Sequence, residues 1–254
     1  MSKLSRRKFI FSAGVTAAGT LLVHGCTSSN ETAESSSTSE PAAQPVANLS
    51  PEETPEITTA KLGFIALTDA APLVIASEKG LFAKYGMTEV EVLKQASWPV
   101  TRDNIELGSA GDGIDGAHIL SPMPYLMTLG TITKQPVPMY ILARLNTNGQ
   151  AISVSEDYLE TKVGLDSSKM KDVFAKAKAE DKELSAAITF PGGTHDLWMR
   201  YWLAAGGVNP ENDISVIPVP PPQMVANMKI GAMVTFCVGE PWNDQLVNQE
   251  QGYT

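Results

Sequence analysis

A histidine lies at the start of an expected helix, directly after a glycine-containing turn, and this arrangement suits the binding of a small anion. The apolar run 186–190 has strand character, and residues 191–193, Pro-Gly-Gly, end it. Thr194 is suited to cap the helix expected over 197–205. Backbone N–H groups at a helix start, together with the positive end of the helix dipole, favour an anion near His195. The alternative is that Thr194 is only a helix cap and His195 only a surface or packing residue.

The other residues with chemical potential form no catalytic or metal-binding pattern. Cys237 is flanked by Phe236 and Val238, which favours a small buried hydrophobic side chain over a reactive thiol. His118 lies in the apolar run 114–120, which favours a core residue, or one that supports a binding residue, over a direct ligand. No metal-ligand spacing or phosphate-loop glycine pattern is present in the sequence, so we expect neither a metal nor a cofactor.

The first 25 residues have the pattern of an export signal. Residues 5–10, SRRKFI, form a twin-arginine signal, and the modestly apolar run 11–23 that follows is too short to span a membrane. Residues 23–26, VHGC, resemble a lipobox, in which cleavage before the cysteine leaves Cys26 as the lipid-carrying N-terminus. The alternatives are a chance basic start and an unmodified thiol. The combination predicts export as a lipoprotein, with residues 1–25 removed.

The segment 26–57 is expected to be a flexible tether. It is rich in Ser, Thr, Glu, Ala and Pro and has few large apolar residues, so it cannot offset the entropy lost on ordering. Residues 1–25 carry four basic and no acidic side chains, so their removal changes the formal net charge from −9 to −13. Such an acidic chain is not expected to bind nucleic acid and would repel anions at long range. Any anion must therefore be held by local donors.

Strand-like and helix-like segments alternate along the folded part, which begins near residue 58. This alternation predicts an α/β fold with parallel sheets covered by helices, and ligands beyond the carboxyl ends of the strands. The segments with strand character are 61–67, 90–94, 138–145, 151–154, 186–190, 214–219 and 233–238, the last being the final expected strand. The segments with helical character are 72–85, 122–129, 167–181, 197–205 and 220–229.

Several separated stretches of the folded part carry a resemblance to a known family. They include 63–69 (GFIALTD), 94–98 (KQASW), 143–150 (ARLNTNGQ), 190–198 (FPGGTHDLW) and 237–243 (CVGEPWN), together with 71–76, 115–120 and 220–228. The chain resembles, over residues 61–254, the substrate-binding lipoproteins of ABC-type nitrate transporters. A sister group of these proteins binds bicarbonate, and more distant relatives bind sulfonates or thiamine precursors.

The resemblance implies a two-lobe architecture of the type II periplasmic binding proteins, in which the lobes close on the ligand by a hinge motion. Lobe one would comprise residues 58–148 and resume over 236–254, and lobe two would comprise 149–235. Members of the family continue beyond the point that corresponds to residue 254, so we expect lobe one to be truncated and a ligand-binding lysine to lie in the remaining portion. The expected partners are the permease and ATPase subunits of a transporter, and the expected location is the periplasmic face of the cytoplasmic membrane.

The resemblance also implies a set of ligand-binding residues, namely Trp98, Gln150, His195 and Gly239. Nitrate is a planar anion with three acceptor oxygens and no proton to donate, so its pocket must consist of donors. The indole, amide and imidazole groups and the backbone at the glycine suit this requirement. Each position has a plain alternative: Trp98 as a core aromatic, Gln150 as a solvated turn residue and Gly239 as the start of the turn into Pro241.

Bicarbonate also carries a hydroxyl donor, so its receptor gains from a carboxylate acceptor. The stretches 192–196 (GGTHD) and 237–241 (CVGEP) keep the nitrate-like form. The chain departs from the nitrate-binding pattern at Pro99, which removes one N–H beside Trp98, at Asp112, and at 234–235, which replace a more acidic pair. The resemblance therefore implies nitrate, with nitrite as a further ligand and bicarbonate as the alternative.

An exported hydrolase that uses Cys237 or a serine with His195 is the alternative from a different class of protein. The sequence has no nucleophile-elbow signature, and Asp196, adjacent to His195, need not face it. We therefore expect a binding protein and not an enzyme. A ligand sensor that signals without transport would have the same pocket.

Overall fold

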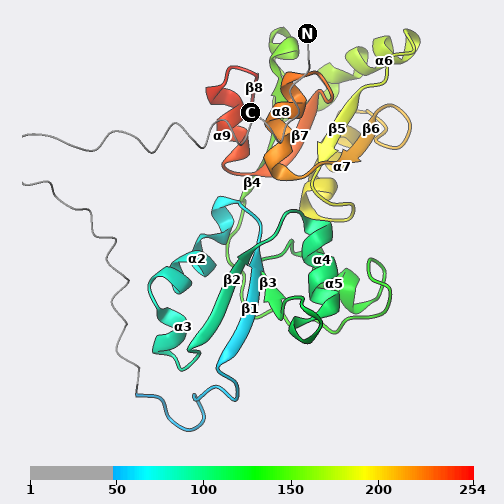
Figure 1. Cartoon of the computed structure of the whole chain (residues 1–254). Coiled ribbons are helices and arrows are strands. Elements are labelled where there is room, and N and C mark those ends of the chain that lie inside the picture. The colour runs from blue at the N-terminus through cyan, green and yellow to red at the C-terminus, as the bar shows by residue number, and fades with distance from the viewer. Residues whose placement is uncertain (1–47) are drawn as a thin grey trace, which may run out of the picture. The chain divides into compact units, whose positions relative to one another are not determined.

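The structure, a computed structural model, describes residues 48–254, and its strands form two sheets (Figure 1). The expected signal segment 1–25, Cys26 and most of the expected tether lie outside the described residues. Among the helices in the described part, none is long and apolar enough to cross a membrane.

The first sheet contains three parallel strands in the order β2-β1-β3. They are β1 (Thr59–Phe64), β2 (Glu89–Lys94) and β3 (Gly116–Ala117). The helical segments of this part are η1 (Thr68–Ala70), α2 (Ala71–Glu78), α3 (Leu81–Lys84), α4 (Trp98–Leu107), η2 (Ser109–Gly111) and α5 (Pro122–Thr128). The expected helix 72–85 is interrupted at Gly80, whose φ of 63° lies in the left-handed region that glycine adopts without strain.

The second sheet contains five strands in the order β6-β5-β7-β4-β8. They are β4 (Gln150–Ser155), β5 (Ser185–Ile188), β6 (Ser215–Pro218), β7 (Thr235–Gly239) and β8 (Gly252–Tyr253). The pairs β5–β6 and β5–β7 are parallel, whereas β4 runs antiparallel to both β7 and β8. The prediction of parallel sheets therefore holds for the first sheet and for β5, β6 and β7, and is wrong for β4 and β8.

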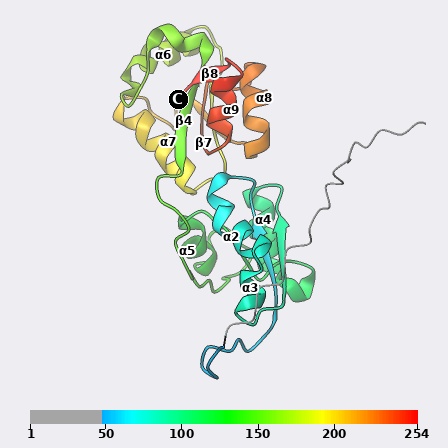
Figure 2. The same cartoon turned by 90° about the vertical axis from the view of Figure 1, so that its left-hand side faces the viewer.

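Helices cover both faces of the second sheet. They are η3 (Glu156–Thr161), η4 (Ser167–Met170), α6 (Lys171–Ala179), α7 (Thr194–Ala205), η5 (Pro221–Gln223), α8 (Met224–Lys229) and α9 (Trp242–Asn248). Figure 2 shows α7 on one side of β4 and β7, and α8 and α9 on the other. The helix α7 contacts β5 and β7, and α9 contacts β4 and β7. The alternation of strand-like and helix-like segments in the sequence thus produces the expected arrangement, a sheet covered by helices.

Three expectations about the order of elements are wrong. The segment 138–145 forms no strand, because no described strand pairs with it, and its Leu142 is 95% exposed. The run 233–238 is not the last strand, since α9 and β8 follow it. Residues 236–254 do not return to the first sheet: β7 and β8 both pair with β4 in the second sheet.

A shared apolar core joins the ends of β1 and β7. It contains Ile65 and Leu67 from the segment after β1, together with Phe236 and Val238 of β7. The backbone N–H of Thr68 also donates to the carbonyl oxygen of Glu240 at 2.8 Å. The carboxyl ends of a strand from each sheet therefore meet, which is where an α/β fold places its ligand.

Candidate functional site

Trp98 begins α4 and is fully buried, with an exposed fraction of 0%. The hydroxyl of Ser97 caps the helix by accepting the N–H of Val100. Pro99 occupies the first turn, where a backbone N–H has no intrahelical partner, so its missing N–H costs the helix nothing. The indole Nε1 of Trp98 has no hydrogen-bond partner among the described residues. A buried donor is therefore available at the start of α4.

His118 and Asp69 form a buried pair next to this tryptophan. His118 follows β3, and its ring centroid lies 5.4 Å from that of Trp98. Its Nε2 lies 3.1 Å from Oδ1 of Asp69, which belongs to η1 beyond the end of β1. Neither Nδ1 of His118 nor Oδ1 of Asp69 has a partner in hydrogen-bonding geometry within residues 48–254.

Three buried polar atoms without hydrogen bonds among residues 48–254 thus come from neighbouring residues: Nε1 of Trp98, Nδ1 of His118 and Oδ1 of Asp69, the last of which still lies 3.1 Å from Nε2 of His118. An unsatisfied buried polar group costs roughly 1–3 kcal/mol, and native proteins contain few of them. Their concentration at one place marks a location for a polar ligand. The sequence-based interpretation of His118 as a core or supporting residue is compatible with its burial, but one of its ring nitrogens remains without a partner.

The helix that carries His195 begins one turn earlier than expected. It starts at Thr194, and Gly193 occupies the cap position, so the predicted capping role of Thr194 is wrong. The carboxylate of Asp196 instead accepts the N–H of Gly192 at 2.8 Å, and it also pairs with Arg200 at 2.6 Å. Asp196 is therefore engaged with the turn and the helix and is not a partner of the adjacent imidazole.

The imidazole of His195 is 2% exposed and faces the end of β5. Its Nδ1 lies 2.6 Å from the hydroxyl oxygen of Thr189. Burial lowers the pKa of His195 to about 4; the carboxylate of Asp69 acts to raise this pKa, and His118 acts to lower it. His195 is therefore neutral at pH 7, and it lies within electrostatic range of the Asp69–His118 pair.

Gln150 and Gly239 are opposite each other in the antiparallel pair of β4 and β7. The side-chain amide of Gln150 donates to the carbonyl oxygen of Thr194, at the long distance of 3.4 Å. A Cβ added at Gly239 would lie 3.0 Å from the carbonyl oxygen of Gly149 and 3.5 Å from the side chain of Leu67. A side chain at position 239 would therefore press against the carbonyl of Gly149, just before β4, whereas the contact with Leu67 would be ordinary van der Waals contact.

Contacts join the sequence-predicted residues in two groups. Gly239 pairs with Gln150, whose amide reaches the residue before His195. In the second group the His118 ring lies beside Trp98, and His118 also acts to lower the pKa of His195. Sequence reasoning missed Asp69 and Thr189, although both follow strands at the edge where a ligand was expected.

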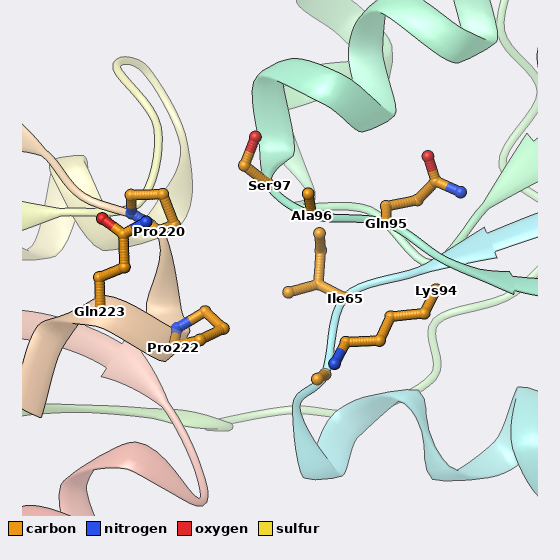
Figure 3. A pocket seen from close by; sticks show the side chains of 9 residues that line it. Ile65, Lys94, Gln95, Ala96, Ser97, Pro220, Pro222 and Gln223 are labelled. Carbon is orange, nitrogen blue, oxygen red and sulfur yellow. The ribbon is translucent and has the colours of Figure 1, made fainter. Parts of the chain in front are cut away.

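A cavity of about 390 Å³ adjoins this cluster (Figure 3). Figure 3 shows residues beyond β1 and β2 on one side, and residues that precede α8 on the other. The lining residues are Ile65, Ala66, Lys94, Gln95, Ala96, Ser97, Pro220, Pro222 and Gln223. None of the four predicted ligand residues lines it, but Ser97 directly precedes Trp98. Lys94 is the single charged residue of the lining, so the cavity suits the approach of an anion.

The described part of the chain offers no site for metal-dependent or thiol chemistry. Within residues 48–254, no group of three or more His, Cys, Asp or Glu side chains is placed to hold a metal ion. Cys237 is fully buried, as predicted, and burial raises the pKa of its thiol to about 12. A thiolate nucleophile at this position is therefore not supported.

Comparison with known proteins defines the family. A model of the NMT1-like family matches residues 53–254. The chain belongs to the NMT1-like family. Over its whole length, this NMT1-like chain is 63% identical to the nitrate/nitrite binding protein NrtA of Nostoc sp. strain PCC 7120. It is 42% identical, over 98% of its length, to the bicarbonate-binding protein CmpA of Synechococcus elongatus.

The structure of this NMT1-like chain is similar to the crystal structure of the periplasmic nitrate-binding protein NrtA from Synechocystis PCC 6803. The TM-score is 0.76 and the identity 65%, over 79% of this chain and 51% of that protein. The chain covers 57% of the Nostoc protein and 55% of CmpA, so it spans about half the length of the curated relatives it matches. The predicted resemblance and the α/β fold of periplasmic solute-binding proteins are thus confirmed, and these relatives are binding proteins.

Proposed function

We propose that this chain binds nitrate, with nitrite as a further ligand, and forms part of a receptor that delivers the anion to an ABC transporter. The observation that carries the proposal is that Gln150 pairs with Gly239 and reaches the residue before His195, while Trp98 and His118 lie side by side, each with a buried nitrogen that has no partner among residues 48–254. The identity of 63% to a nitrate/nitrite binding protein, against 42% to a bicarbonate-binding protein, supports the same ligand.

The chemistry of the proposed site matches an anion that only accepts hydrogen bonds. Trp98 offers an indole N–H, and His195, neutral at pH 7, offers one N–H from its ring. The amide of Gln150 is held only by a 3.4 Å contact and is free to turn toward a ligand. These local donors would capture a small anion despite the net charge of −9.

Bicarbonate is the second candidate, because one feature of the site favours it. Oδ1 of Asp69 is a buried acceptor that makes no hydrogen bond to the described residues, and the hydroxyl of bicarbonate could donate to it. However, this oxygen already lies 3.1 Å from Nε2 of His118, so it is not free for a second partner. Nitrate is therefore the proposed ligand, and bicarbonate is the competing candidate that a titration must exclude.

The role that we propose for this protein is that of a receptor and not of an enzyme. The Cys237 thiol is buried and has a raised pKa. The Thr189 hydroxyl lies 2.6 Å from Nδ1 of His195, but it is only 3% exposed, and within residues 48–254 no carboxylate or carbonyl is hydrogen-bonded to the other ring nitrogen to orient it as a base. We further propose that Cys26 carries a lipid that anchors the receptor at the periplasmic face of the cytoplasmic membrane. The expected partners are permease and ATPase subunits. Cys26→Ala should then release a soluble or unprocessed protein, and a wild-type protein that stays soluble after export would contradict the anchor.

Calorimetric titration of the full chain with nitrate, nitrite, bicarbonate and sulfate tests the ligand. A hydrogen bond to a charged group is worth roughly 1.5–3 kcal/mol, so His195→Ala and Gln150→Ala should each weaken nitrate binding roughly 10- to 150-fold. The melting temperature without ligand serves as the control for folding. Preference for bicarbonate over nitrate, or wild-type nitrate affinity in both variants, would overturn the proposal.

A further inference from the structure

The two ring nitrogens of His195 have different environments. Nδ1 lies 2.6 Å from the hydroxyl oxygen of Thr189, and both side chains are buried, with exposed fractions of 2% and 3%. Thr189 directly follows β5, and His195 is the second residue of α7. The glycine turn between them therefore brings a hydroxyl from the end of a strand against a ring at the start of a helix. Nε2 makes no side-chain hydrogen bond within residues 48–254.

Only one ring nitrogen of His195 carries a proton near neutral pH. Burial is the main cause that lowers the pKa of this histidine to about 4, while Asp69 acts to raise the pKa and His118 acts to lower it. In a neutral imidazole, one nitrogen donates a hydrogen bond and the other accepts one. The partner of Nδ1 therefore decides what Nε2 can offer to a ligand.

A hydroxyl at Nδ1 is the kind of partner that an anion receptor needs. A carboxylate or carbonyl at that position only accepts, so it would keep the proton on Nδ1 and leave a lone pair on Nε2, as in a general base or a metal ligand. A threonine hydroxyl can donate to Nδ1, and the ring proton then resides on Nε2. Because nitrate has no proton to give, it can accept a hydrogen bond from Nε2 only when the ring proton is on that nitrogen.

We propose that Thr189 is a positioning residue for anion binding: its hydroxyl donates to Nδ1 of His195 and thereby directs the Nε2–H donor at the bound anion. This inference rests on the proposed function and adds a determinant of ligand class to it. The arrangement presents a donor to an acceptor oxygen of the anion and leaves no acceptor on Nε2 for a hydroxyl such as that of bicarbonate. Thr189 acts through His195 and need not touch the ligand.

The protonated nitrogen of His195 can be identified directly by nitrogen NMR of histidine-labelled full chain saturated with nitrate. We expect the proton on Nε2. A proton on Nδ1 in the nitrate complex would overturn the inference, and this measurement requires no variant to fold.

Nitrate titration of two variants and a control provides the second test. Thr189→Val removes the hydroxyl at nearly constant shape and should weaken nitrate binding by roughly 2- to 12-fold, the value of one neutral hydrogen bond. Thr189→Ser should restore the wild-type affinity. Thr235→Val removes another buried hydroxyl, which donates to the carbonyl of Ser153 at 2.8 Å, and should leave the affinity unchanged.

The outcomes separate the inference from the proposed function. If the wild-type chain does not bind nitrate, the proposed function fails and the inference fails with it. If the wild type binds nitrate and Thr189→Val binds it equally well, only the role of Thr189 is refuted. Equal losses in Thr189→Val and Thr235→Val would show a general effect of buried hydroxyls and would also refute it.

Discussion

The indole ring of Trp98 and the imidazole ring of His118 lie 5.4 Å apart at an angle of 58°, and each has a buried nitrogen that finds no hydrogen-bond partner in the described part of the chain. One ring comes from the start of α4 and the other from the residue after β3. Trp98 follows β2 and His118 follows β3, the two strands that flank β1, and parallel strands end at the same edge of a sheet, so the topology of the first sheet brings these residues together. Their nitrogens define the side of the proposed site that this sheet contributes.

Replacement of Trp98 by phenylalanine should weaken nitrate binding without weakening the fold. The indole N–H has no partner among the described residues, so its removal costs no internal hydrogen bond. If it donates to the anion, Trp98→Phe should reduce affinity roughly 10- to 150-fold, while the free protein keeps or slightly raises its melting temperature. Calorimetric titration and thermal melting measure the two quantities.

Trp202 provides a matched control, since its Nε1 donates to the carbonyl oxygen of Gly164 at 3.0 Å. Trp202→Phe should lower the melting temperature and leave nitrate affinity unchanged. If the two variants lost affinity equally, the indole of Trp98 would have no special role in the site.

Gly239→Ala should also reduce nitrate affinity, through the backbone. The added Cβ would meet the carbonyl oxygen of Gly149 at 3.0 Å, so the end of β7 and the residue before β4 must move apart by a few tenths of an ångström. Overpacking of this kind costs roughly 1–3 kcal/mol of folding stability. Titration should show at least about a tenfold loss if the displaced backbone contributes one hydrogen bond to the anion.

The control for this change is Gly164→Ala, because no heavy atom lies within 4 Å of a Cβ at that position. Affinity and melting temperature should both remain close to those of the wild type. Unchanged nitrate binding in Gly239→Ala would remove this glycine from the proposed site.

The layers of the fold were predictable because apolar periodicity is a local property of the sequence. The sheet orders were not, since they depend on which strands become neighbours. The pairing of Gln150 with Gly239 joins residues that are far apart in the chain, and nothing in either segment alone indicates it. For the same reason, the antiparallel direction of β4 was missed. The exposed segment 138–145 shows the converse case, in which a strand-like sequence finds no partner in the described part of the chain.

The site was predictable only where a residue type itself carries the chemistry. The resemblance supplied Trp98 and His195, whereas Asp69 became visible only once the ends of β1 and β3 were adjacent. Thr189 is six residues from His195, and a strand, turn and helix in succession bring it close. This local geometry was within reach of sequence reasoning, but a threonine at the end of a strand has many structural roles.

Lys94→Gln should slow the association of nitrate more than it weakens the final complex. Lys94 is exposed, and it is the single charged residue that lines the cavity beside the proposed site. In a chain of net charge −9, a local cation raises the concentration of anions at the entrance. We expect the association rate to fall roughly two- to fivefold at low ionic strength and the difference to vanish at high salt.

Stopped-flow measurements at two salt concentrations test this effect. Lys178→Gln is the matched control, because Lys178 is paired with Asp213 at 3.2 Å on the surface of the second sheet's helices. An equal change in both variants would indicate a general effect of net charge and would contradict a local role for Lys94.

The protonation of His195 predicts a specific dependence of stability on pH. Its pKa falls from 6.5 to about 4 because of burial, so between these values the unfolded chain binds a proton that the folded chain does not. The free energy of unfolding should therefore decrease as pH falls from about 6.5 to about 4, by roughly 3 kcal/mol from this residue. His195→Gln should remove this part of the pH dependence, and denaturant titrations of both proteins across the range measure the difference.

The same protonation state predicts how nitrate binding responds to pH. If neutral His195 donates through Nε2, affinity should be nearly constant between about pH 6 and 8, because the ring does not titrate there. Asp69 and His118 also lie near the ring, so the comparison must be made against His195→Gln, which keeps both of them. Affinity that rises steeply in the wild type as pH falls from 8 to 6, but not in His195→Gln, would show that the anion binds a charged imidazole.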